Sequence, residues 1–197
     1  MGNWIDRTSH IPINDMNFQE ILEFFMLNCP IKIPGKSNKE RTWRNVSMRG
    51  GQYNDSNLLH AFSIRIKKDL ANQGLYKESD DKIGEVSFDN IEKEYTGQDE
   101  NYNLIVYEVK HGYGKARSIL YSIRCAFAHG SFETVENKKG QKIYKFENFN
   151  TNGRLIARIR LKESVLLGWI KFIREYSPGQ TKKRRKKSPK RELITTT

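Results

Sequence analysis

Apolar residues recur every three or four positions in four stretches of the chain, a spacing that is typical of amphipathic helices. The stretches are residues 14–28, 56–74, 115–129 and 163–176. In the third, Ile119, Ile123 and Phe127 fall on one side, and Gly130 stands where a helix-ending glycine belongs. We predict one helix over each stretch, with Gly74 as the C-cap of the second.

Residues 132–161 follow a different pattern, in which apolar and polar positions alternate as they do in strands. In RLIARIRL one face takes Leu155, Ala157, Ile159 and Leu161. The opposite face takes Ile156, Arg158 and Arg160. The dipeptide Asn152-Gly153 predicts the turn of a hairpin within this segment.

Two further segments give a weaker pattern. LIVYEV, which begins at Leu104, fits either a strand or the first turns of a helix. Residues 77–103 are acidic and polar, which predicts an exposed loop with a short helix near Phe88 to Tyr95.

These elements together predict a mainly α fold. A helical domain spans residues 1–177, and a β-hairpin or small meander is inserted at about residues 132–161. The composition of residues 178–197 predicts a flexible, disordered basic tail.

The net charge of +12 on 197 residues is concentrated in that tail. Its cations are Lys182, Lys183, Arg184, Arg185, Lys186, Lys187, Lys190 and Arg191. Such a run binds nucleic acid through counterion release, with little sequence preference. A solvated tail, or a nuclear import signal in a eukaryotic cell, explains the same composition.

Several classes of protein do not fit the sequence. No stretch approaches 18 consecutive apolar residues, and the first residues do not resemble a secretory signal. The two cysteines, Cys29 and Cys125, lie far apart and outside any metal-binding spacing. We therefore expect a cytoplasmic protein without a bound metal, cofactor or membrane.

The helical stretch RSILYSIRCAFAHGSFE carries two residues that are unusual in an apolar helix, Arg124 and His129. Five residues rotate a helix by about 140° beyond a full turn, so the two side chains do not share a face. They converge only if the helix ends at His129 or if a second subunit contributes the same motif. A simpler interpretation has His129 interacting with the helix terminus and Arg124 reaching solvent.

The segment SIRCAFAHGSF resembles the signature of the HEPN family of helical ribonucleases, an arginine and a histidine separated by four to six residues. The resemblance covers roughly residues 105–135. It implies a HEPN-like helical bundle that acts as a homodimer, and metal-independent RNA cleavage by Arg124 and His129. It also implies a role in defence or as a toxin, with RNA and a regulatory protein or antitoxin as partners. Cys125 departs from the family, which often has asparagine there.

In the implied reaction the RNA 2′-hydroxyl attacks the adjacent phosphorus, leaving a 2′,3′-cyclic phosphate and a 5′-hydroxyl. Histidine transfers protons near neutral pH, and an arginine stabilises charge on the phosphate oxygens. Secondary candidates for substrate binding are His111, Arg117, Tyr121, Cys125, Arg158 and Arg160. Ordinary loop, core and surface roles explain each of these equally simply. An inactive nucleic-acid-binding or regulatory module and a plain interaction protein stay open as alternatives.

Overall fold

The computed structural model describes residues 4–6, 11–29, 56–70, 74–79, 88, 90 and 102–176. Within these ranges the helices are α1 (Met16–Glu23), continued by the π-helical turn η1 (Phe24–Asn28), α3 (Ser56–Leu70), α5 (Lys115–Ala128) and α6 (Glu163–Glu175). The strands are β1 (Gly74–Ser79), β2 (Asn103–Glu108), β3 (Phe132–Glu136), β4 (Lys142–Phe149) and β5 (Leu155–Lys162).

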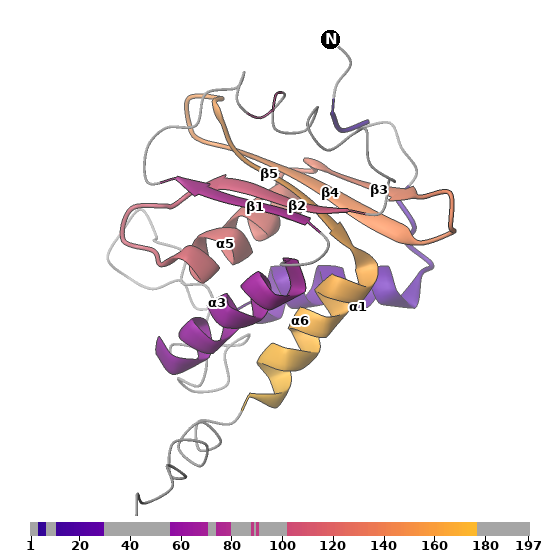
Figure 1. Ribbon diagram of the computed structural model, residues 1–197. Coiled ribbons are helices and arrows are strands. Elements are labelled where there is room, and N and C mark those ends of the chain that lie inside the picture. Colours follow the sequence, from indigo (N-terminus) through magenta and orange to yellow (C-terminus); the bar gives the residue numbers. More distant parts are fainter. Residues whose placement is uncertain are drawn as a thin grey trace, which may run out of the picture.

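The strands form one five-stranded sheet in the order β1-β2-β5-β4-β3. Strands β2, β5, β4 and β3 pair with one another in antiparallel fashion, and β1 lies parallel to β2 at one edge. Figure 1 shows the helices together on one side of this sheet. The fold is therefore α/β in two layers, and the predicted mainly α bundle with a small β insertion is wrong.

The physical reason lies in where the helices bury their apolar faces. Tyr107, Tyr144 and Ile159 stand on the inner face of the sheet and are fully buried in the main core cluster. The helices pack onto these side chains; Trp169 of α6, for example, meets Phe62 of α3 edge-on, with ring centroids 5.3 Å apart. The sheet is thus the scaffold of the domain, because it supplies one whole side of the core.

Most of the predicted helices are confirmed, and one boundary is corrected. Helix α3 ends at Leu70, so Gly74 is not its C-cap but the first residue of β1. LIVYEV is the strand β2, and residues 77–79 belong to β1 rather than to a loop. Phe88 is helical, as predicted, but it is 1% exposed and packs on the sheet.

Both hairpin turns of the antiparallel sheet are closed by an asparagine. The Asn150 side-chain oxygen accepts hydrogen bonds from the backbone N–H groups of Asn152 (3.0 Å) and Arg154 (2.9 Å). Asn137 does the same for Lys139 (3.0 Å) and Gln141 (2.9 Å) in the β3–β4 turn. The hairpin predicted at Asn152-Gly153 is confirmed, and Gly153 adopts the left-handed φ of +74° that the turn needs.

A β-bulge changes the predicted face of Leu155. Leu155 pairs with Phe149, whereas Ala157 pairs with Asn148, so β5 sets one extra residue against β4. Leu155 therefore joins a small outer cluster with Phe88, whereas Ala157 lies in the main core. The expectation that Leu155 shares a face with Ala157 is wrong for this reason.

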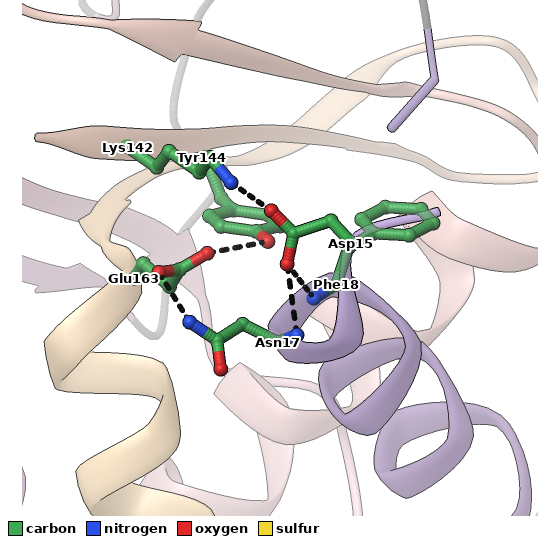
Figure 2. A network of polar contacts seen from close by, with 6 residues as sticks. All are labelled: Asp15, Asn17, Phe18, Lys142, Tyr144 and Glu163. Carbon is green, nitrogen blue, oxygen red and sulfur yellow. Dashed lines mark hydrogen bonds and ion pairs between the residues drawn. The ribbon is translucent and has the colours of Figure 1, made fainter. Parts of the chain in front are cut away.

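A polar network fastens α1 and α6 to β4 (Figure 2). The Asp15 carboxylate caps α1 by accepting from the backbone N–H of Asn17 (2.8 Å) and Phe18 (3.1 Å), and it pairs with Lys142. Glu163, at the start of α6, accepts from the Asn17 amide (2.9 Å) and the Tyr144 hydroxyl (3.2 Å). One network thus joins residues that lie far apart in the sequence.

Replacing Asp15 with alanine is expected to lower the free energy of unfolding by about 1–2 kcal/mol, because the helix loses its cap. Asp15→Asn should cost less, since an amide oxygen still caps the helix and only the pair with Lys142 is removed. Urea denaturation of both variants checks this order. Equal losses of stability in the two variants would mean that the charge, and not the cap, stabilises the junction.

Candidate functional site

Helix α5 ends where the sequence predicts, and His129 is its C-cap. The backbone N–H of Ser131 donates to the carbonyl of Ala126 (2.8 Å), and that of Gly130 donates to Phe127 (3.3 Å). Gly130 has the left-handed φ of +62° that this helix ending requires. The His129 side chain is consequently exposed at the end of an ordered helix.

The exposed side of α5 is a narrow stripe of Arg117, Tyr121, Arg124 and Ala128. Arg117 and Arg124 are seven residues apart, so they differ in direction by only about 20° and lie about 10 Å apart along the axis. The first three side chains of this α5 stripe are half-buried, and nearly all other residues of the helix are buried. The sequence-predicted candidates Arg117 and Tyr121 therefore share the face of Arg124.

Arg124 and His129 lie on the same helix, and the end of α5 after Ala128 meets one of the two conditions for their convergence. Neither residue is buried. Both are thus placed where a ligand from solvent can reach them.

The loop before α5 brings a lysine onto the α5 stripe. The Lys110 Nζ atom lies 3.6 Å from the ring centroid of Tyr121 and 5.0 Å from that of Tyr113. The two rings meet edge-on, with centroids 5.5 Å apart. The backbone N–H of Lys110 donates to Ser118 Oγ (3.0 Å), which holds the loop against the helix.

Sequence reasoning missed Lys110 and Tyr113. A signal was present, because Tyr113 stands between Gly112 and Gly114, and Gly112 takes a left-handed φ of +75° in the turn. The pattern does not show, however, that this turn folds Lys110 back over Tyr121, two turns into the helix. His111, in the same turn, is exposed.

Cys125 lies beneath the α5 stripe rather than on it, with 9% of its surface exposed. Burial raises the pKa of its thiol, against the opposing effects of the Tyr121 hydrogen bond and the Arg124 charge. Burial likewise raises the pKa of Cys29, whose thiol also feels the charge of Arg124. Arg124 thus stands beside two neutral thiols, and Cys125 positions Tyr121 rather than facing solvent.

Arg158 and Arg160 do not form the exposed basic face that their alternation predicts. Arg158 is 8% exposed, and its Nη2 and Nε atoms donate to Glu147 Oε1 at 2.9 Å and 3.1 Å. Arg160 is 5% exposed, stacks 4.1 Å from the Tyr102 ring centroid and donates to the Tyr102 carbonyl. Trp4 covers this face of the sheet, with its ring 4.9 Å from the Arg158 guanidinium. Both guanidinium groups therefore bind partners inside the protein.

The predicted basic tail, residues 178–197, lies outside the described residues. Among the residues that are described, no group of three or more histidine, cysteine, aspartate or glutamate side chains is placed to hold a metal ion. None of the helices in those ranges is long and apolar enough to cross a membrane.

Comparisons with protein-family models, with curated proteins and with solved structures find no significant match to this chain. Any functional argument therefore depends on the residues of the α5 stripe and on His129.

Proposed function

We propose that the chain is a metal-independent endoribonuclease of the HEPN type, in which Arg124 and His129 act on the scissile phosphate. The observation that carries the proposal is the placement of these two residues, on the solvent side and at the end of one buried helix. A core helix gains nothing from an arginine and a histidine at these positions, whereas RNA cleavage without a metal needs both a proton-transfer group and a cation.

His129 would accept the proton of the 2′-hydroxyl as its oxygen attacks phosphorus. The bond from phosphorus to the 5′-oxygen then breaks, and that oxygen gains a proton as the 5′-hydroxyl leaves. Arg124 would offer two N–H groups to the non-bridging oxygens, whose negative charge grows in the transition state. In a homodimer two copies of each residue line one cleft, so that the partner's imidazole supplies the second proton transfer.

A second candidate function is an inactive RNA-binding or regulatory module. Cys125 favours it, because a buried thiol occupies the position where HEPN ribonucleases often have a polar side chain. Its test is RNA binding without cleavage. For either function we propose a cytoplasmic protein that works in defence or as a toxin, with an antitoxin or another regulatory protein as its partner.

The first test is RNA cleavage by the full chain in EDTA, with the 3′ ends of the products mapped. We expect cleavage that persists in EDTA and leaves 2′,3′-cyclic phosphate ends, because the 2′-oxygen is the nucleophile and no metal takes part. Products with 3′-hydroxyl ends, or activity that EDTA removes, would exclude this mechanism. Binding without any cleavage of structured or unstructured RNA would favour the regulatory module.

A further inference from the structure

The cations Lys110 and Arg117 lie beside Arg124, and neither pairs with a carboxylate in the part of the chain that the structure describes. The Arg117 Nε atom is buried and has no hydrogen-bond acceptor within those same residues. The other cations of the sheet region differ, since Lys145 pairs with Glu133 and Arg154 with Glu108. Two adjacent cations without an anion indicate a site that binds one.

Aromatic rings fix both cations in place. Lys110 Nζ lies over Tyr121, and the Arg117 guanidinium lies 5.8 Å from the ring centroid of Tyr113. The Tyr121 hydroxyl is held in turn by its hydrogen bond to Cys125. Cation–π interactions leave the N–H groups free to donate, so the cations are ordered before any ligand arrives.

We propose that Lys110 and Arg117 bind the RNA phosphates next to the scissile one, so that a single strand runs along the α5 stripe from Arg117 to His129. This inference rests on the proposed function. The separation of about 10 Å between Arg117 and Arg124 along the helix axis makes room for separate phosphates at its two ends. A single strand fits better than a duplex, because a flexible backbone can follow one helix face closely.

The test measures RNA affinity against salt concentration in the His129→Ala full chain, which keeps the RNA intact. The probe is a fluorescent single-stranded oligonucleotide. For a single strand, each phosphate that the protein no longer neutralises lowers the slope of log K against log salt by about 0.7. Lys110→Gln with Arg117→Gln should therefore lower the slope by about 1.4 and weaken binding about tenfold at 0.15 M salt.

Two controls isolate the site. Lys171→Gln removes one charge from an exposed lysine of α6, whose side chain is 74% exposed, and should leave the slope within about 0.2 of the parent. Lys110→Arg keeps the charge and should keep the slope. The basic tail contributes equally to every variant, so it cancels from the differences.

The outcomes separate this inference from the proposed function. An unchanged slope in the Lys110/Arg117 double variant would overturn the phosphate site even if the wild type cleaves RNA. A slope that falls as expected, in a protein that never cleaves, would support the phosphate site and remove only the ribonuclease proposal. A fall equal to that of Lys171→Gln would show general charge attraction and would also overturn the site.

Discussion

Replacing His129 with alanine is expected to lower the rate of RNA cleavage by at least about 100-fold, because a general acid–base group contributes at least that factor. The free energy of unfolding should change by less than about 0.5 kcal/mol, since the side chain is exposed and the helix ending is made by backbone groups. Arg124→Ala should lower the rate by about 100- to 1,000-fold, which is typical when a donor to a developing oxyanion is removed. Arg124→Lys should recover only part of it, because an ammonium lacks the planar fork.

His60→Ala is the matched control, because His60 is also an exposed histidine on a helix, here α3. Its cleavage rate should stay within about twofold of the wild type. Initial rates in EDTA, with thermal unfolding of each variant, make the comparison. If His129→Ala and His60→Ala cleave equally well, His129 has no role in the reaction and any cleavage arises elsewhere.

Local patterns are sufficient for the parts of the fold that local physics decides. The helix Lys115–Ala128 and its ending at Gly130 follow from apolar spacing and from a glycine that tolerates positive φ. The hairpin at Asn152-Gly153 follows from turn chemistry in the same way. These features need no knowledge of distant residues.

The sheet could not be predicted because its pairings are distant in sequence. β1 reads GLYKES, which has no clear alternation, and it exists as a strand through its pairing with β2, about 30 residues later. The same limit applies to Arg158, since alternation says only that it lies opposite Ala157. Whether that opposite face meets water depends on Trp4, near the other end of the chain.

The candidate site divides along the same line. Arg124, Tyr121 and Arg117 follow from one helix, whose period places them on one face. Lys110 does not, because its position over Tyr121 depends on the turn at Gly112. The phosphate site that we propose therefore combines a periodic signal with a loop geometry that only the structure reveals.

The pair formed by Arg158 and Glu147 gives the largest stability effect that we expect. Both residues are 9% exposed or less, and the Arg158 guanidinium donates twice to one carboxylate oxygen. Glu147→Leu should lower the free energy of unfolding by about 3 kcal/mol, because it leaves a buried cation without its anion. Glu175→Gln is the control: it breaks an exposed pair with a 4.0 Å separation from Lys171 and should cost under about 0.5 kcal/mol.

The double variant Glu147→Leu with Arg158→Met decides why the single variant is unstable. Methionine retains the apolar contact with Trp4 and removes the unpaired charge, so the double variant should be more stable than Glu147→Leu by about 2 kcal/mol. Urea denaturation of the wild type, both single variants and the double variant measures this coupling. Additive losses of stability would mean that each side chain stabilises the sheet through its own packing. A coupled result would show that the two charges are retained as a unit, which accounts for arginines on this face without any contact to RNA.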